Sequence, residues 1–127
     1  HLLFSMEMIY GKIGRNLPIC MDFYKKMAVE IIEYAELLVK GVSENIASID
    51  EMIGTYCRNW DIMRLAMVDL NILRIGTFEL VFCGDIPSAV IINEAIEISK
   101  IYGTEDSPGF INGILDNVRK KVREESC

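Results

Sequence analysis

The stretch Asp85–Lys100, with the sequence DIPSAVIINEAIEISK, decides the fold. Pro87 suits the first turn of a helix, where its missing backbone N–H costs nothing. After it, apolar side chains recur at steps of three or four residues, which places them on one helix face. Gly103 then provides a typical helix end. The stretch predicts an amphipathic helix whose core stripe is Ile91, Ala95, Ile98 and Tyr102.

The same period continues on both sides of this helix, and convincing two-residue alternation is absent, so the sequence predicts an all-α protein. Upstream, we expect one long helix from about Asp22 that passes through Gly41, and then a helix that closes at residues 83–84. Downstream, Ser107 and Pro108 form a cap and a first turn. The expected core positions are Ile31, Ala35, Leu38, Val42, Ile46, Ile49 and Ile53, then Leu65, Val68, Ile72, Ile75 and Phe78, and finally Ile111, Ile114, Leu115, Val118 and Val122.

Two further segments carry expectations about helix ends and helix packing. Leu2–Tyr10 is short and apolar and precedes a run of Gly, Asn and Pro, which predicts the end of a first helix followed by a turn. Gly113 lies within the period of the last helix, where we expect it to permit close packing of another helix.

The composition excludes several classes of protein. With 127 residues, of which 51% are hydrophobic and 25% charged, the chain suits one domain with a real core. No apolar stretch approaches the ~18 residues of a membrane span. The net charge of −6 argues against binding nucleic acid unaided, because Lys and Arg supply most of that affinity. We expect a cytoplasmic protein without a metal site, in which reduced thiols are buried at Cys20, Cys57, Cys83 and Cys127.

Residues suited to catalysis are scarce, so we expect neither an enzyme nor a cofactor. The single histidine, His1, is terminal, and the sequence has no glycine-rich phosphate loop. Glu94 and Glu97 are the one acid–base pair to consider, but nothing else converges on them. Glu94 has a better structural interpretation, because it and Arg74 lie on apolar helices. Two partly buried opposite charges in a small core are expected to form an ion pair.

Charge is distributed unevenly along the chain. Between Met27 and Cys57 there are six acidic residues and one base. This acidic helix could face a basic protein, with Glu33 and Glu36 as candidate partner-binding residues. The segment from Arg119 to Arg123 holds four bases, which suits the negative end of a terminal helix. Ordinary solvated surface is the alternative for both segments.

Several motifs in one order resemble the NusB family of transcription antitermination factors. The stretch Asp85–Lys100 is similar to the family segment centred on the residues NEA. Downstream and upstream of it, further likeness covers nearly the whole chain, in the segments 102–107 (YGTEDS), 110–116 (FINGILD), 72–80 (ILRIGTFEL) and, more weakly, 41–50 and 3–7.

The resemblance implies an all-helical bundle of about six to seven helices in two subdomains, with residues 1–127 forming a single RNA-binding domain. It implies binding of the boxA sequence of nascent ribosomal RNA together with NusE, a small-subunit ribosomal protein, on the RNA polymerase antitermination complex. Single-stranded RNA is read by stacking on aromatic rings and by acceptors that face base edges. The RNA-side positions of the family fall on Phe4, Asp69, Tyr102, Asp106 and Phe110, with core packing as the alternative for each aromatic.

One departure and two alternatives accompany this resemblance. Family members carry an arginine-rich segment ahead of the first helix, which we expect to be missing here, and its loss would weaken phosphate contacts. The first alternative is a NusB-like accessory domain of a ribosomal RNA cytosine methyltransferase. The second is a dimeric protein-binding helical module without an RNA function, which residues 78–82 could support if they are exposed. The sequence leaves open whether the protein is a monomer or a homodimer.

Overall fold

The computed structural model describes residues 21–57 and 65–123, and every regular element within these ranges is a helix. The five helices are α2 (Met21–Glu44), α3 (Ile46–Tyr56), α4 (Met67–Phe82), α5 (Ser88–Tyr102) and α6 (Ser107–Arg123). The all-α prediction is confirmed, although the described ranges hold five helices where six to seven were expected. The helix expected at Leu2–Tyr10 lies outside them.

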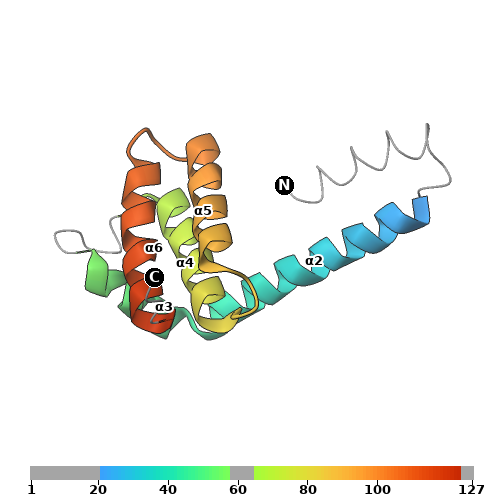
Figure 1. Ribbon diagram of the computed structural model, residues 1–127, viewed down its shortest axis with the longest axis horizontal. Coiled ribbons are helices and arrows are strands. Elements are labelled where there is room, and N and C mark those ends of the chain that lie inside the picture. Colours follow the sequence, from blue (N-terminus) through green and yellow to red (C-terminus); the bar gives the residue numbers. More distant parts are fainter. Residues whose placement is uncertain (1–20, 58–64, 124–127) are drawn as a thin grey trace. The chain divides into compact units, whose positions relative to one another are not determined.

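The chain divides into two compact units, His1–Val39 and Lys40–Cys127. In the first unit, the structure describes the N-terminal part of α2. In the second unit, α4, α5 and α6 pack pairwise against one another, and α3 contacts both α4 and α6 (Figure 1). The core of the second unit is therefore enclosed by helices that come from one continuous stretch of the sequence.

Apolar side chains from all four helices fill this core. In α6, Ile111, Leu115 and Val118 have no exposed surface, and Ile114 is only 4% exposed, which confirms the predicted stripe up to residue 118. Val122, its last predicted member, is only half-buried. Burying such side chains removes apolar surface from water, at roughly 25 cal/mol per Å². The largest fully buried apolar residues are Ile49, Ile53, Leu73, Leu80, Ile111, Leu115 and Val118.

The buried stripe of α5 follows the prediction only in its first half. Ile91 and Ala95 are buried, whereas Ile98 is 43% exposed and Tyr102 is 51% exposed. Ser99 is fully buried instead, since it continues the four-residue step from Ile91 and Ala95. Its hydroxyl donates to the backbone carbonyl of Ile96 at 2.7 Å. This hydrogen bond offsets the free-energy cost of burying the hydroxyl group. Hydrophobicity alone could not mark this position.

In α4, apolar side chains surround the helix, so their spacing does not select one face. Ile72 and Phe78 are buried as predicted, but Val68 and Ile75 are 38% and 39% exposed. The buried residues of this helix are Leu70, Ile72, Leu73, Gly76, Thr77, Phe78 and Leu80.

The predicted long helix is interrupted at Asn45, between α2 and α3. The helix passes through Gly41 as predicted. Four residues later, the side-chain amide of Asn45 donates to the carbonyl of Gly41 at 2.8 Å. The backbone N–H of Asn45 donates to the same carbonyl at 3.1 Å, so the hydrogen-bond ladder continues through the interruption. The backbone of Asn45 nevertheless departs from helical geometry, with φ −118° and ψ 17°. The interruption is one residue long, and Ile49 and Ile53 still reach the core.

The predicted ion pair between Arg74 and Glu94 is wrong, because Arg74 pairs with Asp50. Its Nε and Nη2 donate to the two carboxylate oxygens of Asp50, each at 2.8 Å, and join α4 to α3. Hydrogen bonding to Asp50 raises the pKa of the Arg74 guanidinium above its usual value. Glu94 is exposed on α5. Residue spacing along α4 did not reveal that Arg74 faces α3.

We expect the substitution Arg74→Met to lower the free energy of unfolding by about 2 kcal/mol, because the Asp50 carboxylate would lose a charged, two-point hydrogen-bond partner. Glu94→Gln is the control and should change stability by less than about 0.5 kcal/mol. Urea unfolding followed by circular dichroism measures both variants. Equal losses would show that the Arg74–Asp50 pair contributes nothing specific.

The prediction for Gly113 is also wrong. This glycine is exposed on α6, and no described atom lies within 4 Å of where a Cβ would stand. Close helix approach occurs instead at Gly76 of α4, where an added Cβ would lie 2.9 Å from Cδ1 of Leu115. The packing contact between α4 and α6 thus uses a glycine that the sequence analysis did not single out.

Two of the four cysteines lie within the described ranges. Cys57 and Cys83 are both buried and free of disulfides, as predicted. Burial raises the pKa of the Cys57 thiol, which disfavours the reactive thiolate form. Cys20 and Cys127 lie outside the described residues.

Candidate nucleic-acid interface

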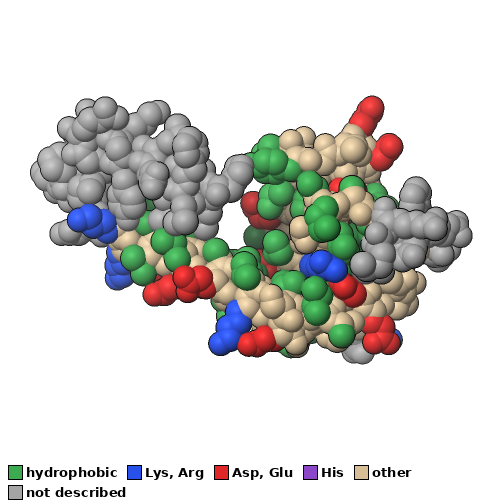
Figure 2. Space-filling model, turned by 180° about the vertical axis from the view of Figure 1, so that it is seen from behind, with side chains coloured by type: hydrophobic (Ala, Val, Ile, Leu, Met, Phe, Trp, Pro, Cys, Tyr) green, Lys and Arg blue, Asp and Glu red, His purple; other side chains and the backbone are tan. Residues whose placement is uncertain are grey.

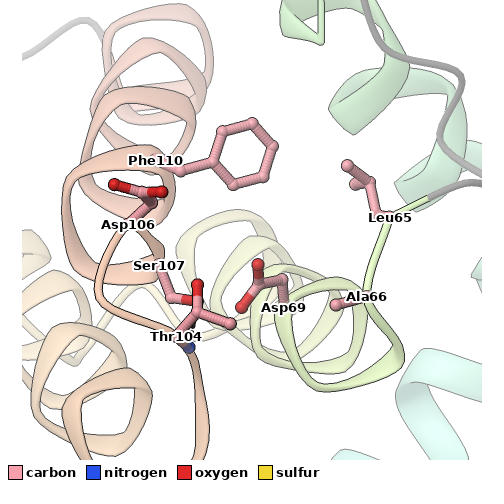
Figure 3. Close-up of a pocket in the computed structure, with 7 residues that line it drawn as sticks. All are labelled: Leu65, Ala66, Asp69, Thr104, Asp106, Ser107 and Phe110. Atoms are coloured by element: carbon pink, nitrogen blue, oxygen red, sulfur yellow. Dashed lines mark hydrogen bonds between the residues drawn. The ribbon is translucent and has the colours of Figure 1, made fainter.

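Three of the five predicted RNA-binding residues line one cavity of about 220 Å³. Asp69 comes from the first turn of α4, Asp106 from the turn before α6, and Phe110 from the start of α6. Figure 3 shows the Asp69 carboxylate and the Phe110 ring directed into the space between these helices. The remaining lining residues are Leu65, Ala66, Thr104 and Ser107.

The turn that carries Asp106 is fixed by Ser107, whose side chain is buried. The Ser107 hydroxyl accepts a hydrogen bond from the backbone N–H of Thr104 at 2.9 Å, and the Ser107 N–H donates to the Thr104 carbonyl at 3.1 Å. A Cβ at Gly103 would stand 2.5 Å from the Ser107 hydroxyl oxygen and 2.7 Å from the carbonyl oxygen of Ser99. Glycine at this position therefore lets the turn close tightly and present Asp106 at the cavity.

Asp69 contributes an acceptor that nothing satisfies within the described part of the chain. Its Oδ1 is buried and has no hydrogen-bond partner there. The positive end of the α4 dipole favours an acidic side chain in this first turn. A buried acceptor left without a partner costs about 1–3 kcal/mol.

The lining of the cavity restricts the chemistry of its ligand. The Phe110 ring offers a flat apolar face, while ionised carboxylates only accept hydrogen bonds. Two carboxylates in one small cavity also repel a phosphate group. The cavity is smaller than the ~300–1,000 Å³ pockets of drug-sized ligands. A ligand that suits this lining is a single flat ring system with N–H donors at its edge.

The other two predicted RNA-binding residues do not line the cavity within the described structure. Tyr102 is the last residue of α5 and is 51% exposed, one residue before Gly103. Phe4 lies outside the described residues. Of the lining residues that the sequence analysis missed, Ser107 and Thr104 could have been found from the turn they form, whereas Leu65 and Ala66 carry no signal.

The candidate partner-binding residues Glu33 and Glu36 are both exposed on α2. At a separation of three residues on one helix they are neighbours. Figure 2 shows acidic, basic and apolar side chains next to one another along this helix. Although α2 is 24 residues long, neither it nor another described helix is apolar enough to cross a membrane.

The packed helices define an all-helical protein, and the small cavity with an aromatic ring and two carboxylates is its candidate binding site. Comparison with known families identifies the protein further. The chain belongs to the NusB family, whose model matches residues 3–120. The family resemblance inferred from the sequence motifs is thereby confirmed.

Relatives and solved structures agree with this assignment. The transcription antitermination protein NusB of Syntrophotalea carbinolica is 49% identical over 102 residues, which cover 80% of this chain and 65% of that protein. The protein of the same name from Geobacter sulfurreducens is 45% identical over 124 residues, which cover 98% of this chain and 90% of that protein. This chain thus spans slightly less than two thirds of the first relative and nine tenths of the second.

Two solved structures share the fold. Thermotoga maritima NusB matches with a TM-score of 0.70 at 36% identity, over 94% of this chain and 87% of that chain. A chain in a structure described as the crystal structure of a plectonemic RNA supercoil matches with a TM-score of 0.69 at 27% identity, over 92% of this chain and 88% of that chain.

Proposed function

We propose that this protein is a transcription antitermination factor. In this proposal it binds the boxA sequence of nascent ribosomal RNA together with NusE and couples the pair to RNA polymerase in the cytoplasm, without catalysing a reaction. The names of its relatives support this function. The observation that carries it is the convergence of Asp69, Asp106 and Phe110, which the family resemblance assigns to RNA, on one cavity.

The proposed binding mode places one unstacked base in the cavity. The base stacks on Phe110 and turns its polar edge toward Asp69, because single-stranded RNA is bound through aromatic stacking and base-edge hydrogen bonds. Tyr102 and Phe4 would contact neighbouring nucleotides. Since the cavity is acidic and the chain carries a net charge of −6, we expect a basic partner protein to contact most of the RNA phosphates. We therefore expect RNA binding to require NusE.

Phe110→Leu is expected to weaken binding of boxA RNA about tenfold, because stacking of a base on an aromatic ring contributes about 1–3 kcal/mol. The measurement is fluorescence anisotropy of labelled boxA RNA and a scrambled RNA, with and without NusE, at two salt concentrations. Phe82→Leu makes the same change at a ring of α4 that is 52% exposed and does not line the cavity. It should bind as the wild type does.

Two results of this experiment would contradict the proposal. One is equal affinity of the wild-type protein for boxA and scrambled RNA in the presence of NusE. The other is an unchanged affinity of the Phe110→Leu variant. Circular dichroism of both variants establishes that they are folded before their affinities are compared.

The acidic face of α2 is the proposed contact for the basic partner protein. We expect the double charge reversal Glu33→Lys and Glu36→Lys to weaken NusE binding about tenfold, because opposite charges across an interface steer and orient association. The matched control reverses Glu94 and Glu97, which have the same spacing and are exposed on α5. Isothermal titration calorimetry with NusE compares the two. Similar losses in both double variants would indicate a response to net charge and not to this face.

A further inference from the structure

We propose that the groove between α5 and α6 binds an extended, acidic segment of a partner protein. The two helices lie side by side in Figure 1, and the groove is lined by side chains from the N-terminal part of α5 and the C-terminal half of α6. It shares no residue with the cavity at Phe110. The inference rests on the proposed function and assigns a surface to the step that couples the protein to RNA polymerase.

The groove has room for several side chains of a ligand. Its volume is about 480 Å³, which is more than twice that of the cavity at Phe110 and falls within the ~300–1,000 Å³ of typical ligand sites. Two of the residues that line it, Ala89 and Asn93 of α5, are exposed. The groove is therefore open to solvent and admits part of a continuous chain.

The α5 side of the groove combines an apolar surface with an amide. Ile92 is buried and Ile96 is half-buried, and both line the groove with aliphatic side chains. The side-chain amide of Asn93 offers donors and an acceptor, as the backbone of an extended peptide does. This side of the groove therefore suits a peptide that places apolar side chains on the two isoleucines and pairs its backbone with Asn93.

The α6 side of the groove carries a net positive charge. Nε of Arg119 donates to Oδ1 of Asp116 at 2.9 Å, and Nζ of Lys120 lies 3.3 Å from Oδ2 of the same carboxylate. Hydrogen bonding to Arg119 lowers the pKa of Asp116, so this carboxylate stays ionised at neutral pH. Two positive charges then face one negative charge. In a chain whose net charge is −6, this wall attracts an acidic side chain of a partner.

The groove is preformed, because Arg123 joins its two helices at one end. Nη1 of Arg123, near the end of α6, donates to the hydroxyl of Ser88, the first residue of α5, at 3.1 Å. Ser88 lines the groove and is buried. The positive end of the α5 dipole lies at the same place and favours an acidic ligand. A preformed site does not have to be ordered when the partner binds, which favours affinity.

These features favour a protein segment over RNA. Among the described residues that line the groove none is aromatic, whereas single-stranded RNA is bound by stacking its bases on aromatic rings. RNA also carries a phosphate at every nucleotide, and its affinity depends on several contacts from Lys and Arg. One carboxylate beside apolar side chains matches the single net charge and the aliphatic surface of this groove.

Overlapping peptides that tile the subunits of RNA polymerase provide the probe. Each labelled peptide is titrated, by fluorescence anisotropy, with the complex of this protein, NusE and boxA RNA. We expect the wild-type complex to bind a peptide with acidic and apolar side chains. Ala89→Trp should weaken this binding about tenfold, because the indole ring would occupy the groove. Val90→Trp is the matched control, since Val90 is 49% exposed on the same helix and does not line the groove.

Lys120→Glu tests the contribution of charge to peptide binding. It changes the net charge of the α6 side from one positive to one negative, so the affinity for the acidic peptide should fall about fivefold. Lys40→Glu is the control, because Lys40 is also exposed and also lies four residues from an acidic partner, Glu44. It should leave the affinity for the peptide unchanged. Circular dichroism of all four variants establishes that they are folded.

The outcomes separate the groove from the proposed function. If the wild-type complex binds no acidic peptide, or if Ala89→Trp keeps the wild-type affinity, the groove assignment is overturned and the antitermination function stands. If Ala89→Trp weakens binding of boxA RNA with NusE, or changes the sedimentation mass of the protein, the groove holds RNA, NusE or a second copy, which also overturns the assignment. If no complex forms on boxA RNA, the proposed function fails, and the same peptides titrated with the protein alone decide the groove.

Discussion

Replacing Arg123 by methionine is expected to lower the free energy of unfolding by about 3 kcal/mol, the largest stability loss of any single exposed or half-buried side chain considered. Arg123 lies at the C-terminal end of α6, and its guanidinium reaches the C-terminal end of α4. The Nε, Nη1 and Nη2 atoms donate at 2.7–3.2 Å to five oxygens, those of the carbonyls of Glu79, Leu80, Cys83 and Ile86 and of the Ser88 hydroxyl.

The physical reason is that carbonyls at and after the end of a helix lack the full set of partners that the helix interior provides. The carbonyls of Glu79 and Cys83 accept one backbone N–H each, at 2.9 and 3.0 Å, and take the guanidinium as a second donor. The guanidinium supplies donors to them and places a positive charge at the negative end of the α4 dipole. Hydrogen bonds from a charged group contribute about 1.5–3 kcal/mol each, but bonds that share one donor group are not additive. We therefore expect a loss of about 3 kcal/mol in the free energy of unfolding, which is less than the sum of five independent hydrogen bonds.

Urea unfolding of three variants tests this expectation. Arg123→Lys should recover little of the loss, because an ammonium group is a single point of charge and cannot spread over five acceptors. Lys121→Met removes a neighbouring positive charge that is exposed, and its stability should stay within about 0.5 kcal/mol of the wild type. If Arg123→Met lowers the free energy of unfolding no more than Lys121→Met does, the contacts of the Arg123 guanidinium do not stabilise the protein.

Gly41→Ala is expected to destabilise the protein by about 3 kcal/mol, at the upper end of what overpacking a core costs. An added Cβ would overlap with Cζ of Phe78. Phe78 is only 5% exposed, and its ring lies 5.0 Å from that of Phe82, measured between centroids. A rigid buried ring cannot move aside as the end of a flexible side chain would.

Gly113→Ala supplies the matched control for this prediction, because it makes the same change in a helix with open space around it. In an exposed helix interior, alanine is favoured over glycine by about 1 kcal/mol, so this variant should be more stable than the wild type. Opposite signs of the two stability changes, measured by urea unfolding, are the expected result. Stabilisation by both substitutions would show that Gly41 is not held against Phe78.

Much of the fold could be predicted from the sequence because helix periodicity is a local signal. The bounds of α6 and its buried stripe follow from Ser107 and the apolar spacing after it, and Gly103 ends α5 as expected. The partner of Arg74 could not be predicted, since it depends on how α4 is rotated relative to α3. The interruption at Asn45 is one residue long and leaves the apolar period unchanged, so the period could not reveal it.

The candidate site was predicted only in part, and from the family resemblance instead of from helix periodicity. Family resemblance assigned Asp69, Asp106 and Phe110, and helix packing brings them to one cavity. Nothing in the sequence indicated Leu65 or Ala66 as cavity walls. The burial of the Asp69 Oδ1 atom without a partner among the described residues is likewise a property of the folded chain, which the sequence does not show.

The Arg123 contacts also bear on the order in which the chain folds during synthesis. The guanidinium joins residue 123 to carbonyls that lie 37–44 positions earlier. Contacts at such separations form late, because the intervening loop must be closed first. The contacts between Arg123 and the end of α4 are therefore expected to form only after the whole of α6 has been synthesised. A nascent chain stalled before that point would expose a partly formed bundle to proteases and chaperones.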